Sequence, residues 1–148
     1  MRALVAAAFF AAALPAVAQD VSDCDWRADM RFIAEPWETS SRTFANGDVR
    51  LVLLDTYEPA MVPFQIAVIS PPFDELGWPQ CMVIGAFNEI DFAALAAAYD
   101  PAVGLIFSVP VKIYDGMTDS TPNARLGFSL NQSTGAVVAR VERAGPWR

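Results

Sequence analysis

The sequence predicts a mainly β fold, an antiparallel sandwich or a partly closed barrel of about seven or eight strands with one short helix near residues 91–99. Three observations predict it. They are a hairpin signal within residues 37–56, several apolar runs bounded by proline or glycine, and a single stretch with apolar residues at helical spacing. Since no internal repeat or composition break divides residues 19–148, we expect them to form a single β-rich domain.

The hairpin signal is the strongest of the three. Two strand-like runs are joined at Asn46-Gly47, a dipeptide that accepts the positive φ angles of a tight turn. In the second run, two sets of side chains alternate: Val49, Leu51 and Leu53 on one face, and Arg50, Val52 and Leu54 on the other. The first face is fully apolar and the second is partly apolar, which predicts a strand covered on both sides.

Further stretches alternate as strands do: residues 30–33, 64–70, 81–87, 104–114, 125–131 and 137–141. The nearly continuous apolar character of residues 64–70 predicts a central strand that stops at Pro71-Pro72. Pro110 within the fourth run predicts an edge position or a bulge, because proline has no N–H to donate to a neighbouring strand.

The helical spacing follows Asp91, a good N-cap residue. Phe92, Leu95, Ala96 and Tyr99 fall at i, i+3, i+4 and i+7, the apolar stripe of a short amphipathic helix. The residue before a proline disfavours the α region, so Pro101 predicts that this helix ends by about Tyr99.

The first 18 residues have the features of a signal peptide. An apolar run follows Arg2, and the small residues Ala16 and Ala18 precede Gln19, which predicts cleavage after Ala18. The run is too short to span a bilayer, so we expect no membrane span in the mature chain and a periplasmic or secreted location. A buried N-terminal helix is the alternative interpretation.

The excess of acidic residues limits the classes of partner that the chain can bind. The chain carries 10 basic and 17 acidic residues, a formal net charge of −7, and loss of Arg2 with the signal peptide makes it one unit more negative. Nucleic acids and anionic membranes both require a dense basic patch, so we expect neither as a partner.

Two cysteines, Cys24 and Cys81, remain in the mature chain, and in an exported protein such a pair predicts a disulfide. A disulfide between two residues so far apart in the sequence closes a long loop, which stabilises the fold by about 4 kcal/mol on the chain-entropy model. The alternatives are two separate buried thiols or a redox pair, but there is no C-x-x-C motif and no histidine to lower a thiol pKa.

The remaining motifs favour binding over catalysis. The absence of histidine excludes a Ser-His-Asp triad, a Cys-His pair and a histidine-ligated zinc site, and no phosphate or dinucleotide motif is present. We therefore expect no cofactor and no metal. Asp20, Asp23, Asp25 and Asp29 lack the spacing of a calcium loop and are interpreted as a solvated acidic arm.

The predicted loop at residues 71–80 presents Phe73 and Trp78 beside acidic residues, which makes these two aromatic side chains candidates for contact with an envelope protein partner. In the alternative interpretation they fold back over the edge of the core. The leading functional hypothesis is a binding or protein-interaction module.

A carboxylate-dependent hydrolase acting on envelope polysaccharide is the alternative from another class. Six acidic residues are candidates for its catalytic pair: Asp55, Glu58, Asp74, Glu75, Asp115 and Asp119. Their spacing does not select a pair. A purely structural envelope component is a third possibility.

Two segments, FANGDVRLVLLDTYEPA at residues 44–60 and AAYDPAVGL at residues 97–105, give the chain a resemblance to small uncharacterised exported proteins of alphaproteobacteria. The resemblance covers most of the mature chain. It implies a periplasmic or secreted location and transfers no activity or site residues.

Overall fold

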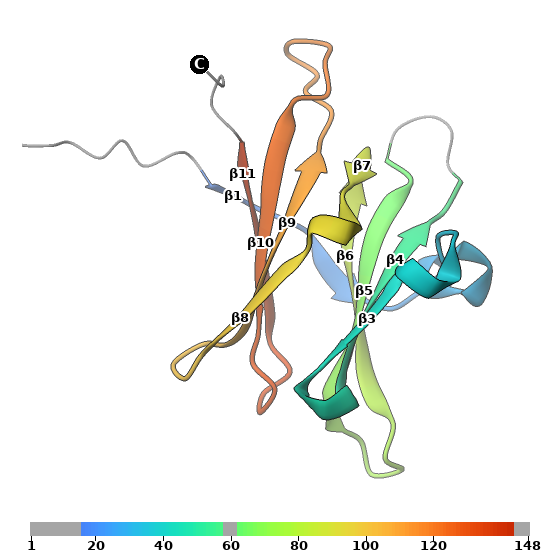
Figure 1. Cartoon of the computed structure of the whole chain (residues 1–148), viewed down its shortest axis with the longest axis vertical. Helices are drawn as coiled ribbons and strands as arrows, with labels where there is room; N and C mark the ends of the chain where they lie inside the picture. The colour runs from blue at the N-terminus through green and yellow to red at the C-terminus, as the bar shows by residue number, and fades with distance from the viewer. Residues whose placement is uncertain (1–15, 58–61, 144–148) are drawn as a thin grey trace, which may run out of the picture.

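The computed structural model describes residues 16–57 and 62–143, which fold into two antiparallel sheets that face each other (Figure 1). The six-stranded sheet contains β1 (Ala16–Ala18), β7 (Glu89–Ile90), β8 (Ala96–Asp100), β9 (Gly104–Lys112), β10 (Asn123–Leu130) and β11 (Val137–Arg143). The five-stranded sheet contains β2 (Val21–Asp23), β3 (Ser41–Phe44), β4 (Val49–Asp55), β5 (Phe64–Phe73) and β6 (Pro79–Phe87). Of the two predicted architectures, the sandwich is therefore correct.

The strand order is β1-β11-β10-β9-β7 in one sheet, with β8 also paired to β9, and β2-β6-β5-β4-β3 in the other. β5 is central, as predicted, but it continues through Pro71 and Pro72 to Phe73. The register with β6 shifts between Ser70 and Phe73, so the two prolines fall in an irregularity of the ladder that needs no N–H from them.

The main core lies between the sheets. Phe107 of β9 stacks on Phe128 of β10, with 4.8 Å between ring centroids, and meets the ring of Phe44 from the opposite sheet edge-on at 5.0 Å. Leu51 and Ile66 contribute fully buried side chains from the five-stranded sheet. The inward faces of both sheets thus follow the period-two alternation of the sequence.

A second, smaller cluster lies on the outer face of the five-stranded sheet. Val52, Leu54 and Ala67 are buried there beneath Ala28 and Ile33. The prediction that the strand after Asn46-Gly47 is covered on both sides is confirmed.

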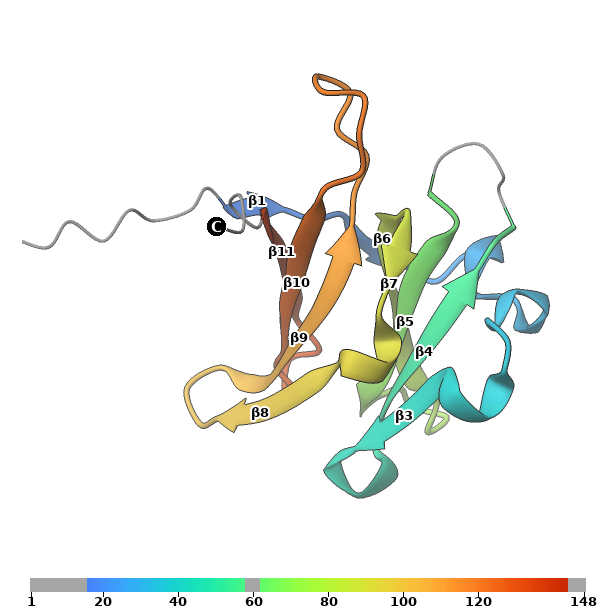
Figure 2. The same cartoon turned by 45° about the horizontal axis from the view of Figure 1, so that its top comes forward.

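The cover is a segment of three 3-10 turns: η1 (Trp26–Ala28), η2 (Met30–Phe32) and η3 (Trp37–Thr39). Figure 1 and Figure 2 both show it on the side of this sheet that faces away from the six-stranded sheet. The predicted strand at residues 30–33 is wrong, because the Asp29 carboxylate caps a turn at Met30, and only Ile33 forms a bridge, to Leu54.

The helix predicted near residues 91–99 is also wrong. Asp91 does act as an N-cap, since its side chain accepts from the N–H of Ala94, but it starts only the 3-10 turn η5 (Phe92–Ala94). Phe92 and Leu95 are buried, as the apolar stripe predicted, and the chain then extends as β8 along β9. Pairing with an existing strand outweighs the small helix preference of a short alanine run.

Pro110 does not mark an edge strand. β9 is flanked by β10 on one side and, on the other, by β8 and β7 in succession. Pro110 falls between the stretches paired with β8 and with β7, and its carbonyl accepts from the N–H of Asp91. The missing N–H therefore lies at a break in the ladder, where no partner strand requires it.

Both predicted hairpins are confirmed. β3 pairs with β4 across η4 (Ala45–Gly47), in which Asn46 and Gly47 have φ angles of 57° and 98°. β10 pairs with β11 from Ala124 opposite Arg143 to Leu130 opposite Val137, one residue short of the predicted end of the first strand. Within the described residues, no helix has the length and apolar character needed to cross a membrane.

Candidate functional site

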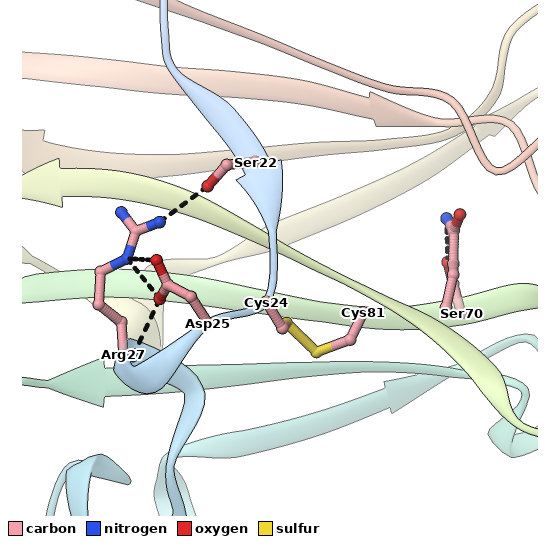
Figure 3. The surroundings of a disulfide bond; sticks show 7 residues. Ser22, Cys24, Asp25, Arg27, Ser70 and Cys81 are labelled. Carbon is pink, nitrogen blue, oxygen red and sulfur yellow. Dashed lines mark hydrogen bonds and ion pairs between the residues drawn. A yellow bond between two sulfur atoms is a disulfide. The ribbon is translucent and has the colours of Figure 1, made fainter.

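The predicted disulfide is present. Cys24, directly after β2, is bonded to Cys81 of β6, with 5.3 Å between their Cα atoms, and the N–H of Cys24 donates to the carbonyl of Cys81 (Figure 3). The bond fixes one end of residues 24–40, which we call the arch because they cross the outer face of the five-stranded sheet. Figure 3 shows the first residues of the arch beside the disulfide, where the guanidinium of Arg27 donates to the carboxylate of Asp25 and to the hydroxyl of Ser22.

The other end of the arch is held by main-chain hydrogen bonds to β4. The N–H of Ala34 donates to the carbonyl of Leu53 at 3.0 Å, and the N–H of Leu53 donates to the carbonyl of Ser40 at 2.8 Å. A segment that contains only short 3-10 turns is thereby fixed at both ends over an apolar sheet face.

Two members of the predicted acidic arm form local caps instead. The carboxylates of Asp25 and Asp29 each accept from a backbone N–H two residues later and each pair with an arginine at 2.8 Å, Arg27 and Arg31 respectively. Hydrogen bonds from these guanidinium groups lower the pKa of both carboxyl groups. The charges of Asp25 and Asp29 are therefore neutralised by arginines of the arch itself.

A groove of about 280 Å³ lies between the arch and the outer face of the sheet. The arch lines it with Ala28, Met30, Ile33 and Trp37. Its floor is formed by the sheet residues Ser41, Arg50, Val52, Leu54, Ala67, Ile69 and Cys81. Arg50 is the only charged side chain in this lining. The sequence did not predict this groove, although the apolar residues on the second face of β4 indicated that a further segment covers that face.

The two predicted contact residues lie at the tip of the β5–β6 hairpin. Phe73 ends β5 and Trp78 closes the turn, so only residues 74–78 lie outside the strands, fewer than the predicted loop at 71–80. Phe73 is 51% exposed and Trp78 66% exposed, and Leu76 between them, which sequence analysis missed, is 83% exposed. The alternative in which the aromatic side chains fold back over the core is therefore wrong.

Asp74 fixes the backbone of this tip. Its carboxylate accepts from the N–H of Leu76 at 2.9 Å and of Trp78 at 2.8 Å, and its own N–H donates to the carbonyl of Trp78. Gly77 supplies the positive φ that the turn requires, 83°. The three apolar side chains thus project from a turn whose conformation is set by four hydrogen bonds, the fourth from Gly77 N–H to the Asp74 carbonyl.

Glu58, one of the six candidate hydrolase carboxylates, lies outside the described residues, and none of the other five lines the groove. Asp55 accepts from the N–H of Tyr57, and Asp74 and Glu75 belong to the hairpin tip. Asp115 and Asp119 share one loop, where Asp115 pairs with Arg143 at 2.9 Å and Asp119 accepts from the hydroxyl of Tyr114.

The electrostatics of that loop also oppose general-acid catalysis. The backbone N–H of Met117 and the charge of Arg143 lower the pKa of Asp115, whereas a general acid needs a raised pKa. Among residues 16–57 and 62–143, no group of three or more cysteine and acidic side chains is arranged to hold a metal ion.

The predicted signal-peptide cleavage site lies at an edge of the sandwich. Ala16 and Ala18 belong to β1, which pairs with β11, and the backbone N–H of Gln19 donates to the carbonyl of Ala139 at 3.0 Å. Residues 1–15 of the predicted signal peptide lie outside the described residues. Cleavage after Ala18 stays a prediction, and it would remove β1 from the edge of β11.

Comparison with protein-family models, curated proteins and solved structures finds no match to this chain.

Proposed function

We propose that the chain is an exported binding module that contacts a protein partner through the apolar tip, which we define as Phe73, Leu76 and Trp78. The observation that carries this proposal is their exposure of 51%, 83% and 66% on a turn of fixed backbone. Large apolar side chains on a hairpin tip gain free energy when a partner removes them from water. Tryptophan is also enriched among residues that dominate interface energies.

The fixed backbone of the turn at residues 74–78 favours binding and also keeps the three apolar side chains exposed. Four hydrogen bonds within residues 74–78 hold the turn, so little loop entropy is lost when a partner docks. Asp74 and Glu75 place negative charge beside the apolar side chains. The complementary surface is therefore an apolar pocket flanked by lysine or arginine, on a protein of the cell envelope.

Three features support an exported location, either periplasmic or secreted. The first is the signal-peptide pattern of residues 1–18, and the second is the resemblance to small exported proteins. The third is the Cys24–Cys81 disulfide, because such bonds persist in oxidising compartments.

Site-specific photo-cross-linking tests the proposal in cells that express the full chain. A photoreactive residue in place of Leu76 is expected to give a discrete adduct with one envelope protein. The same residue in place of Met117, which is 96% exposed in the β9–β10 loop, is the control for exposure alone. Equal adducts from both positions, or none from position 76, would contradict the proposal.

The double variant Phe73→Ala/Trp78→Ala measures the energetic contribution of the apolar tip. Affinity for the cross-linked partner is expected to fall at least about 30-fold, since loss of hot-spot side chains costs about 2 kcal/mol or more. Tyr99→Ala/Val103→Ala, which removes exposed apolar side chains at the β8–β9 turn, is the matched control and should leave affinity unchanged.

A further inference from the structure

We propose that the groove beneath the arch binds a small monocarboxylate with an apolar body, of the class of medium-chain fatty acids. This site is separate from the apolar tip. It rests on the shape of the groove, the apolar character of its lining and the placement of one unpaired positive charge.

The size of the groove matches a small amphiphile. Its volume is about 280 Å³, whereas a cavity of about 150 Å³ is enough to bind benzene. Sites for drug-sized ligands start at about 300 Å³. The groove therefore holds a body larger than a single aromatic ring and smaller than most drug-sized molecules, and it is too small for a folded partner element.

The lining fits an apolar body. Val52 and Ala67, which are buried, form the floor together with the partly buried Ile69. At the mouth, Met30 and Trp37 remain 72% and 57% exposed. A ligand that fills the groove would cover apolar surface of both, and the flexible thioether of Met30 adapts readily to ligand shape.

The positive charge of Arg50 favours a ligand with a negatively charged head group. Arg50 is exposed and makes no ion pair among the described residues, whereas Arg27 and Arg31 of the arch are each paired with an aspartate at 2.8 Å. Arg50 on β4 is paired directly with Ile69 on β5, so its side chain extends from a position beside the apolar floor. A carboxylate at this point gains a charge-assisted, fork-like hydrogen bond while its tail remains in the groove.

Isothermal titration of the oxidised mature chain with octanoate, 1-octanol and octyltrimethylammonium tests this inference, because the three probes share one tail and differ in the head group. Octanoate is expected to bind most tightly. Arg50→Gln should weaken octanoate about tenfold and leave 1-octanol unchanged. Arg140→Gln, at an exposed arginine on β11 of the other sheet, is the matched control and should change neither.

Arg50→Glu provides the sharper second variant, since it is expected to reverse the preference between octanoate and octyltrimethylammonium. Amide chemical-shift changes at Val52, Ala67 and Ile69 on octanoate addition would place the ligand in the groove. Absence of octanoate binding, equal affinity for octanoate and 1-octanol, or an unchanged preference in Arg50→Glu would each overturn the proposal. Both arginines are exposed, so the variants retain the fold, which circular dichroism checks.

Discussion

The two sheets of this sandwich differ in what covers their outer faces. The outer positions of β4 and β5 are apolar, with Val52, Leu54 and Ala67 buried beneath the arch. The outer positions of β10 and β11 carry Arg125, Ser129, Arg140 and Glu142, and none of these residues is buried. The five-stranded sheet is therefore a middle layer between the core and the arch, while the outer face of the six-stranded sheet at β10 and β11 is open to solvent.

This difference shows how a small domain can build a groove on the outer face of a sheet. A strand with two apolar faces needs a second cover, and a short irregular segment supplies it only if its ends are fixed. Here the disulfide fixes one end, and the main-chain hydrogen bonds that link Leu53 of β4 to Ala34 and Ser40 fix the other. Because such a segment covers the sheet incompletely, a groove remains.

The largest expected effect comes from releasing the arch. Cys24→Ser/Cys81→Ser should lower the free energy of unfolding by about 4 kcal/mol on the chain-entropy model, as measured by urea denaturation. Hydrogen exchange in the variant should increase most at residues 26–33 and least in β9 and β10. Uniform loss of protection across both sheets would show that the arch is not a separate layer.

A smaller effect distinguishes the two outer faces directly. Val52→Ser should destabilise the protein by about 2 kcal/mol, because it removes buried apolar surface and adds a hydroxyl to the groove floor. Ser129→Val, at an outer position of β10, should change stability by no more than about 0.5 kcal/mol. Similar losses in the two variants would mean that the arch contributes little to burial of β4.

The smallest effect is the pH dependence of the arch. Arg27 and Arg31 lower the pKa of Asp25 and Asp29, so these carboxylates stabilise the fold above their ordinary pKa of about 4. That contribution is lost as pH falls from about 4 through the lower pKa of the folded state.

Carboxyl-carbon NMR titration checks both values. Arg27→Gln should raise the pKa of Asp25 towards its ordinary value and leave that of Asp29 unchanged. A rise in both, or in neither, would contradict the local origin of the two shifts.

Sequence patterns were sufficient for the elements whose local and long-range preferences agree. The alternation of residues 49–54 gave both faces of β4 correctly, and Asn46-Gly47 gave the turn before it. The even cysteine count, together with the predicted signal peptide, correctly predicted the disulfide. In each case the residue types leave few physical alternatives.

The errors occurred where tertiary pairing decides between competing local structures. Asp91 and the buried pair Phe92 and Leu95 fit one helical turn equally well, and only the vacant edge of β9 selects a strand afterwards. Pro110 looked like an edge residue because the break between β8 and β7 cannot be inferred from the sequence of β9. The groove was missed for a similar reason, since its walls are far apart in the chain.

Hydroxyl-radical footprinting of the mature chain, with and without the cross-linked partner, tests the central claim of a binding module most directly. The account predicts that Phe73, Leu76 and Trp78 become protected while Met117 keeps its reactivity. Protection at Met117 with none at the apolar tip would contradict the account.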